Sequence, residues 1–254
     1  MEPGASAPTE VTVSGDGREL SLVGTVLPIR NVTWAPPSTG LVYGVLLNDR
    51  DDLERLAARW SDAPYKGLPK APALYIKPYN THAGHGATIH LPAGVSRLSL
   101  GASLGIVIGK PACRLSERAA LDAVQGYTIV NDLSVPHDNL FRPPIREKCF
   151  DGACPIGPWI VPREDFPQPD RAVVSVYVNG ERLHRRTLGG LLRPVARLIA
   201  DVTDFMTLLP GDVLLAGMPL DVPAAGAGDT IAVEIEGLGT LENRLVALSE
   251  AVAA

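Results

Sequence analysis

Residues 126–161 concentrate the side chains of this chain that carry charge or bind anions. These side chains are Asn131, Asp132, His137, Asp138, Asn139, Arg142, Arg146, Lys148 and Asp151. The segment opens and closes with apolar runs at 127–130 and 159–161, and glycines and prolines interrupt it. A long segment without periodicity between two core strands is uncommon and often functional. A polar surface loop that only connects two strands is the alternative, and the pattern leaves it open.

Two cations in this segment indicate an anionic small-molecule ligand. Lys148 follows a charged run and precedes Cys149 and Phe150, where an ammonium group can hold a carboxylate or polarise a carbonyl. Arg142 lies between an aromatic residue and prolines and can grip a second carboxylate through its two-pronged guanidinium. His137 is a candidate proton shuttle, since histidine exchanges protons near neutral pH. Salt bridges from these cations to neighbouring aspartates are the alternative without a ligand.

Other motifs are weaker. The H-x-x-H pair His82 and His85 has metal-ligand spacing only on a helix, and the glycines around it disfavour one. The run GASLG at 101–105 lacks the ending of a phosphate loop, and no G-x-S-x-G is present. Cys149 beside Lys148 is either a nucleophile or a buried, inert thiol, and we favour the thiol.

Composition narrows the class of protein. The 254 residues are 46% hydrophobic and 20% charged, enough for a sizeable core. A net charge of −5 disfavours nucleic acid as a partner. No apolar run is long enough to cross a bilayer, and the three cysteines lack metal-type spacing. We expect a soluble, cytoplasmic protein with no membrane partner.

Periodicity predicts a β-dominated α+β fold. Helices are expected at 51–60, after Ser116 and at 194–205. Strands are expected at 11–13, 20–26, 41–47, 73–77, 98–108, 127–130, 159–161, 172–178, 181–184, 213–216, 231–235 and near 241. Residues 1–22 are expected to form a flexible or short-stranded extension, and 23–250 a single domain.

A series of short motifs resembles the fumarylacetoacetate hydrolase family in order and spacing from about residue 23 to 246. The motifs are YIKP at 75–78, LGIVIGK at 104–110, GYT at 126–128, NDLS at 131–134, FDG at 150–152, PIGPW at 155–159, VNGE at 178–181, LPGD at 209–212 and GLG at 237–239. The resemblance implies a mixed β-roll or sandwich with a few packed helices, usually dimeric.

Within the family, residues 63–66, 76–81 and 141–157 resemble the N-terminal-type half of the isomerase/decarboxylases of 4-hydroxyphenylacetate (homoprotocatechuate) catabolism. That branch decarboxylates 5-oxopent-3-ene-1,2,5-tricarboxylate and isomerises 2-hydroxyhepta-2,4-diene-1,7-dioate. The resemblance therefore implies a lyase/isomerase subunit for small anionic 2-oxo or enol acids. It is expected to form a homodimer or a heteromer with a C-terminal-type homologous subunit.

The resemblance also implies a site and a divalent cofactor, Mg²⁺ or Mn²⁺, held by an E-x-E pair and an aspartate. The aspartate matches Asp132, the two family lysines match Lys77 and Lys148, and a substrate-contacting position matches Asn139. Gly101 and Ser103 stand where the family has the two glutamates. Neither offers the anionic oxygen that a hard cation prefers, so this chain is expected to bind metal weakly at Asp132 or not at all.

Further departures lie at Met218, which matches a family threonine, and near residues 51–52, which match a lid histidine loosely. Three hypotheses stay open. One is a decarboxylase/isomerase in which Lys148, His137 and Asp132 are catalytic and Lys77, Asn139 and Arg142 bind substrate. Another is a catalytically silent partner of a metal-bearing homologue. The third is a carbon–carbon hydrolase of the acylpyruvate type, which the missing E-x-E disfavours.

Overall fold

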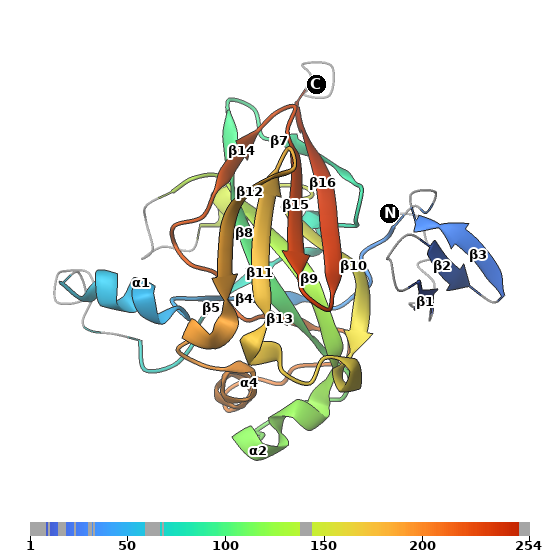
Figure 1. The fold of residues 1–254 in the computed structure, drawn as a ribbon. Coiled ribbons are helices and arrows are strands. Elements are labelled where there is room, and N and C mark those ends of the chain that lie inside the picture. Colours follow the sequence, from blue (N-terminus) through green and yellow to red (C-terminus); the bar gives the residue numbers. More distant parts are fainter. Residues whose placement is uncertain are drawn as a thin grey trace.

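Two curled sheets form the body of the chain (Figure 1). The computed structural model describes residues 9, 11–14, 19–22, 24–29, 32, 34–58, 67, 69–137 and 144–248. Strands dominate, as the sequence predicts, and the fold class is confirmed. In the described part of the chain, no helix is long and apolar enough to span a bilayer.

The larger sheet carries the residues of interest. Its strands run in the order β5-β4-β13-β8-β9-β10-β6, and β14 pairs with β8. The bounds are β4 (Val42–Leu46), β5 (Ala73–Lys77), β6 (His82–Ala83), β8 (Arg97–Ile108), β9 (Val124–Ser134), β10 (Cys154–Pro162), β13 (Val213–Leu215) and β14 (Ala224–Gly226).

This sheet must close into a roll. Strands β5 and β6 lie at its opposite edges, yet only residues 78–81 join them, through the 3₁₀ turn Tyr79–Thr81. Six strand-to-strand steps would separate the edges of a flat sheet by about 29 Å. Four residues reach about 14 Å at most. The sheet therefore curls until its edges approach each other, which brings β5 over β9.

The smaller sheet covers one face of the roll. Its order is β12-β11-β15-β16-β7, with bounds β7 (Thr88–Leu91), β11 (Val173–Val178), β12 (Glu181–Thr187), β15 (Thr230–Ile235) and β16 (Gly239–Ala247). Alternate residues such as Ile231 and Val233 are buried, as period-two patterning requires. They join Leu100, Leu104 and Ile129 of the roll in the main hydrophobic core.

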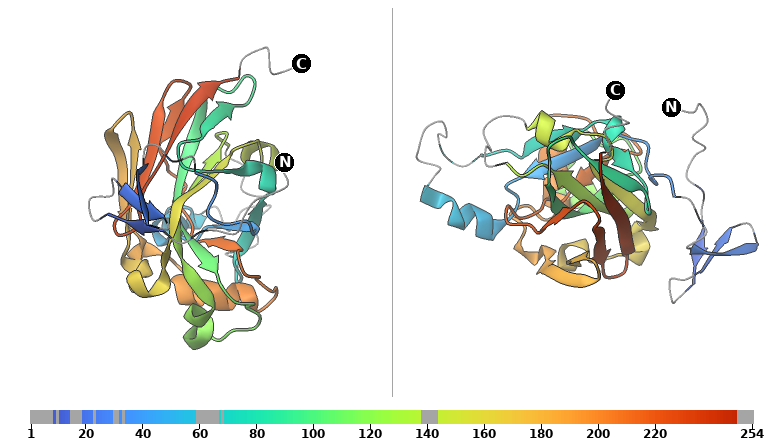
Figure 2. Two further views of the ribbon diagram at one scale, coloured as in Figure 1. Left: turned by 90° about the vertical axis from the view of Figure 1, so that its right-hand side faces the viewer. Right: turned by 90° about the horizontal axis from the view of Figure 1, so that it is seen from above.

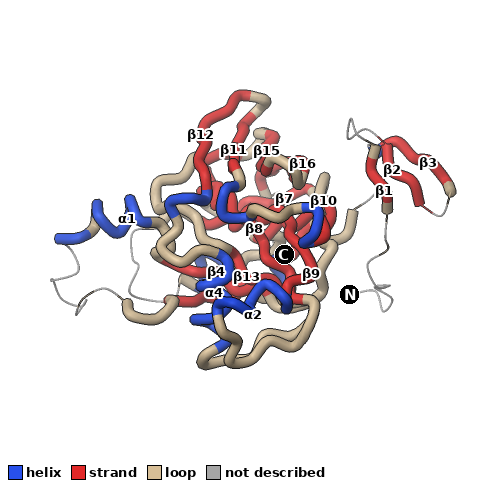
Figure 3. The backbone as a smooth tube through the Cα atoms, turned by 60° about the horizontal axis from the view of Figure 1, so that its bottom comes forward, coloured by secondary structure: helices blue, strands red, loops and turns tan. Residues whose placement is uncertain are grey.

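Helices lie at the margins. They are α1 (Arg50–Arg55), α2 (Glu117–Ala120), α3 (Ile145–Lys148) and α4 (Val195–Thr203). Helices α2 and α4 pack together at one end of the roll, and α1 projects from its side (Figures 1 and 3). Helix α4 buries Val195, Leu198 and Val202 along one face.

A third, three-stranded sheet stands apart from the body (Figures 1 and 2). It consists of β1 (Thr12–Val13), β2 (Glu19–Leu22) and β3 (Thr25–Pro28), which pair only with one another among the described strands. The sequence predicts a single strand at 20–26, but a turn at Gly24, with a φ of +80°, divides it.

The structure corrects the expected loop between 130 and 159. Strand β9 continues to Ser134, so Asn131 and Asp132 lie in a strand. Strand β10 already begins at Cys154, and α3 lies between the two. Burial explains the longer β9, because a strand inside a curled sheet needs no period-two polarity. Ser116 precedes α2 as predicted, but its side chain makes no capping hydrogen bond.

Candidate active site

Strand register directs a row of positions to one face of the roll. Ser99 pairs with Ser134, Gly101 with Asp132, and Ser103 with Val130. Directly opposed residues in a pleated sheet point to the same side. Positions 101 and 103, where the resemblance implies the two glutamates, therefore face the same side as Asp132.

Asp132 lies between two ammonium groups. Lys148 Nζ donates a hydrogen bond of 2.7 Å to Asp132 Oδ2, and Lys77 Nζ lies 2.8 Å from Oδ1 as an ion pair. All three side chains are buried, with exposed fractions between 0% and 3%. Because unpaired charges are costly to bury, each of these groups depends on the others.

Lys77 has little capacity left for a ligand. Its ammonium also donates to the carbonyl oxygens of Leu133, at 3.1 Å, and Lys148, at 2.5 Å. With these two hydrogen bonds and the ion pair to Asp132, the buried ammonium already has three oxygen neighbours within the chain. Substrate contact by Lys77 stays a prediction, and this arrangement does not favour it. Lys77 instead ties the end of β5 to β9 and to the end of α3.

Tyr75 completes the cluster, and sequence reasoning missed it. Its hydroxyl donates a short hydrogen bond to Asp132 Oδ2, and Lys148 Nζ lies 4.7 Å from the centre of its ring. Gly44 allows this placement, because a Cβ at position 44 would collide with the Tyr75 ring. The sequence could have identified Tyr75, because alternate residues of a strand share a face and Tyr75 lies two residues before Lys77 in β5.

The charges shift one another's ionisation. Burial alone would raise the pKa of Asp132, but the charges and hydrogen bonds of Lys148 and Lys77 outweigh it and hold that pKa well below its usual value. Burial lowers the pKa of Lys148, helped by the charge of Lys77, although Asp132 opposes the shift. Burial and the charge of Asp132 raise the pKa of Tyr75 well above its usual value.

A pocket opens beside Lys148. It is lined by Val45, Leu46, Leu47, Ser99, Ser134, His137, Lys148, Met218, Pro219, Leu220 and Val222. His137 therefore lies at the same pocket as Lys148, as the sequence suggests, and its Nδ1 is 3.0 Å from the Val135 carbonyl oxygen. Ser99, Ser134, His137 and Lys148 are its polar lining residues, and the others are apolar. Leu47 adopts a φ of +58°, a strained conformation of the kind that gathers at functional sites.

The residues at this site do not fit a divalent metal. A Cβ at Gly101 would collide with Met218 Sδ and with the backbone oxygen of Asp132, so the first glutamate's space is filled. The Ser103 hydroxyl is bound to Gly217. Asp132 is already neutralised by two lysines. Within the described ranges, no three His, Cys, Asp or Glu residues gather as a metal site, and this includes His82 and His85.

The remaining predicted residues have different outcomes. Asn139 and Arg142 lie outside the described residues. Cys149 is half-buried, and burial raises the pKa of its thiol, which opposes a nucleophilic role. Ser99 and Ser134 were missed, although they follow from Gly101 and Asp132 by steps of two along their strands.

The chain belongs to the fumarylacetoacetate hydrolase family. The family profile "Fumarylacetoacetate (FAA) hydrolase C-terminal" matches residues 41–246. The chain is 36% identical over 211 residues to the 4-hydroxyphenylacetate degradation bifunctional isomerase/decarboxylase of Salmonella dublin, a match that covers 83% of this chain and 48% of that protein. The chain thus spans about half the length of the first curated relatives it matches.

Solved structures agree with this assignment. The 5-carboxymethyl-2-hydroxymuconate delta-isomerase of Mycobacterium smegmatis matches with a TM-score of 0.78 and 31% identity, covering 94% of each chain. Fumarylpyruvate hydrolase of Pseudomonas aeruginosa, solved with Mn²⁺ and pyruvate, matches with a TM-score of 0.72 and 24% identity, covering 98% of this chain and 100% of that one. The second likeness shows the shared fold.

Proposed function

We propose that the pocket beside Lys148 binds a small 2-oxo or enol acid and supports its decarboxylation or isomerisation. The observation that carries this proposal is the charge of the buried cluster. Two ammonium groups oppose one carboxylate, which leaves a net charge of +1 in the cluster, and Lys148 of this cluster lines the pocket. A carboxylate or enolate oxygen is the natural partner of such a site.

The roles follow from position. Lys148 holds the carboxylate or enolate oxygen, because it lines the pocket and its ammonium donates to a single oxygen of Asp132. Ser99 and Ser134, which line the same pocket, supply hydroxyl donors. His137 moves a proton to or from the carbon that reacts. Asp132 and Lys77 orient Lys148 and do not need to touch the ligand.

The substrate class follows the relatives. We propose that this chain is a subunit of the decarboxylase/isomerase of 4-hydroxyphenylacetate catabolism, which acts on dicarboxylic or tricarboxylic 2-oxo or enol acids. Arg142 and Asn139 are proposed to contact the second acidic group. Because the chain spans about half of its curated relatives, a second copy or a homologous C-terminal-type subunit is the proposed partner.

A silent partner subunit is the second candidate. The specific observation in its favour is the filled site at Gly101, where Met218 takes the space of a metal-binding carboxylate. In this alternative the pocket has lost its reaction, and the chain stabilises an active homologue.

Turnover by the purified chain separates the two. The two acids named for this branch would be followed by ultraviolet absorbance, with wild type, Lys148→Met and, as a control, Lys110→Met, whose side chain is exposed. The proposal expects turnover by wild type and Lys110→Met and a loss of at least about 100-fold in Lys148→Met. Equal rates in all three would refute the role of Lys148. The silent partner would be established by two results together. Wild type alone would show no turnover, and turnover would appear once the homologous subunit is added, at a rate that Lys148→Met leaves unchanged.

A further inference from the structure

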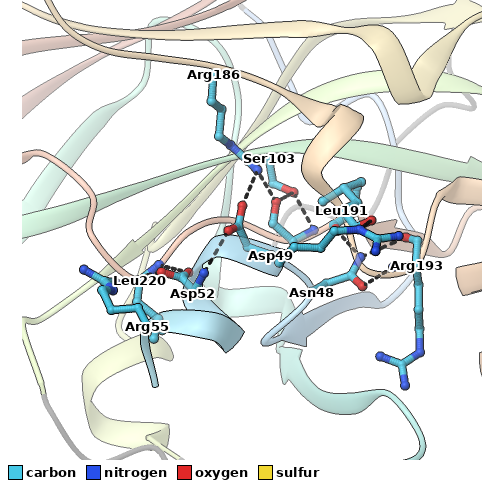
Figure 4. Close-up of polar contacts among 12 residues, drawn as sticks. Asn48, Asp49, Asp52, Arg55, Ser103, Arg186, Leu191, Arg193 and Leu220 are labelled. Carbon is cyan, nitrogen blue, oxygen red and sulfur yellow. Dashed lines mark hydrogen bonds and ion pairs between the residues drawn. The ribbon is translucent and has the colours of Figure 1, made fainter. Parts of the chain in front are cut away.

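Residues 217–220, which line the pocket through Met218, Pro219 and Leu220, are held by hydrogen bonds at both ends; we call these residues the wall segment. At one end, the Gly217 carbonyl oxygen accepts a hydrogen bond of 2.6 Å from Arg186 Nη2 (Figure 4). Gly217 also exchanges hydrogen bonds with the Ser103 hydroxyl, at 3.1 and 3.2 Å. At the other end, the Leu220 N–H donates to Asp52 Oδ2 at 2.6 Å.

The two anchors are joined through the start of α1. Arg186 Nη1 lies 3.7 Å from Asp49 Oδ2, and Asp49 Oδ1 accepts a hydrogen bond from the Asp52 N–H at 3.2 Å (Figure 4). Asp52 Oδ1 accepts from Arg55 Nη2 at 2.7 Å. The Asp52 and Arg186 side chains are 6% and 11% exposed. Burial of a charged group is costly unless hydrogen-bonded partners compensate it. Asp52 and Arg186 both have such partners, so each holds its end of the wall segment in a fixed position.

Met218 and Pro219 lie between the anchors and line the pocket. The Met218 thioether fills the space above Gly101, directly beside the Asp132 strand position. When the acidic group of a ligand lies at Lys148, Met218 and Leu47 are among the residues that line the space around the rest of the ligand. The position of Met218 therefore limits what can extend from that acidic group.

We infer that Arg186 and Asp52 are positioning residues of the pocket, which act by holding Met218 where it restricts the length of the acid bound beside Lys148. The inference rests on the proposed function for its ligand class, 2-oxo acids. Neither residue lines the pocket, so any effect on ligand choice must pass through the wall segment.

The test compares a short and a long probe. Oxalate presents the acid head alone, and 2-oxoadipate adds a longer chain. Calorimetry would give both affinities for wild type, Met218→Ala, Arg186→Met and the double variant. Met218→Ala is expected to shift the affinity ratio towards 2-oxoadipate by about tenfold or more, since single methylene-sized changes alter selectivity by that order.

Arg186→Met is expected to shift the ratio in the same direction, and to add no further shift when Met218 is already alanine. Non-additivity of this kind marks two residues that act through one structure. The control is Arg185→Met, which removes the exposed neighbour on β12. Additive shifts, or equal behaviour of the Arg186 and Arg185 variants, would overturn the inference. Loss of folding stability alone cannot produce the expected pattern, because it weakens both probes alike.

A second readout does not depend on a ligand. Peroxide oxidation of Met218, mapped by mass spectrometry and expressed relative to Met206, reports how firmly the wall segment is held. The relative rate is expected to rise severalfold in Arg186→Met and Asp52→Ala, but not in Arg185→Met or Asp51→Ala, which alter exposed neighbours. If the wild-type protein binds neither acid, the proposed function fails. The relative oxidation rate of Met218 then decides alone whether Arg186 and Asp52 position the wall segment. An unchanged rate in both anchor variants would refute it, and Asp52→Ala serves if Arg186→Met does not fold.

Discussion

Asp132, Lys148 and Lys77 form a cluster in which each charge is necessary for the burial of the others. Positions 101 and 103 carry no carboxylate, and two ammonium groups hold Asp132. These two positive charges explain how the Asp132 carboxylate can be fully buried.

Asp132→Asn is expected to destabilise the chain by about 3–5 kcal/mol, because it leaves two buried ammonium groups close together without their counter-charge. Chemical denaturation would measure the loss. Asp122→Asn is the matched control, since Asp122 is 78% exposed in its ion pair with Arg163, and it should cost less than about 1 kcal/mol. Equal losses for the two variants would show that the cluster contributes no more than a surface pair.

Oxalate affinity is expected to fall at a lower pH than it would if the binding lysine had the usual pKa. In the proposed function the ammonium of Lys148 binds the anion. Burial lowers the pKa of that ammonium from the usual 10.5, so its positive charge is lost as pH rises through the lowered value. Calorimetry from about pH 7 to about pH 10 would follow the change. Affinity that stays constant to pH 10, or falls equally in Lys148→Met, would contradict the role of Lys148.

At the scale of elements, the curl of the large sheet makes the site. Tyr75 and Lys77 reach Asp132 although β5 and β9 are four steps apart in the sheet order. Gly44 and Gly101 permit the two close approaches on which the site depends, one under the Tyr75 ring and one under Met218.

Gly44→Ala is therefore expected to cost about 1–3 kcal/mol, since a Cβ there meets the Tyr75 ring and forces it from Asp132. The free energy of unfolding and the near-ultraviolet circular dichroism of the tyrosines would report both effects. Gly190→Ala is the control, because nothing lies within 4 Å of a Cβ at that position. Equal stability of the two variants would mean that β5 adjusts without cost.

The sequence alone predicts some of the residues that form this site. Asp132 and Lys148 stood out by type and crowding, and the family resemblance added Lys77 and the missing carboxylates. Tyr75, Ser99 and Ser134 were within reach of period-two reasoning. Arg186 was not, because its contact with Gly217 depends on how β12 lies against the loop after β13, which no local pattern encodes. The length of β9 was underestimated because burial on both faces removes the alternation that marks a strand's end.

At the scale of the whole molecule, the N-terminal sheet is separate from the body that holds the site (Figure 1). Its buried Leu20 belongs to neither hydrophobic cluster of the body. Removal of residues 1–28, which include the extension predicted at 1–22 and all three strands of this sheet, is therefore expected to change the free energy of unfolding by less than about 0.5 kcal/mol and to leave oxalate affinity unchanged. A large loss of stability would show that the sheet packs on the body.

The proposed function requires that ammonium groups, and not a metal ion, hold the acid at this site. Calorimetric titration of oxalate into protein treated with a chelator, repeated with added Mg²⁺ and Mn²⁺, tests it most directly. Once the metal–oxalate complex that forms in solution is allowed for, we expect free oxalate to bind with the same affinity in all three conditions, and Lys148→Met to abolish this binding. Oxalate binding that requires Mg²⁺ or Mn²⁺ would contradict the account, because a metal site would then exist that Gly101, Ser103 and the paired Asp132 do not provide.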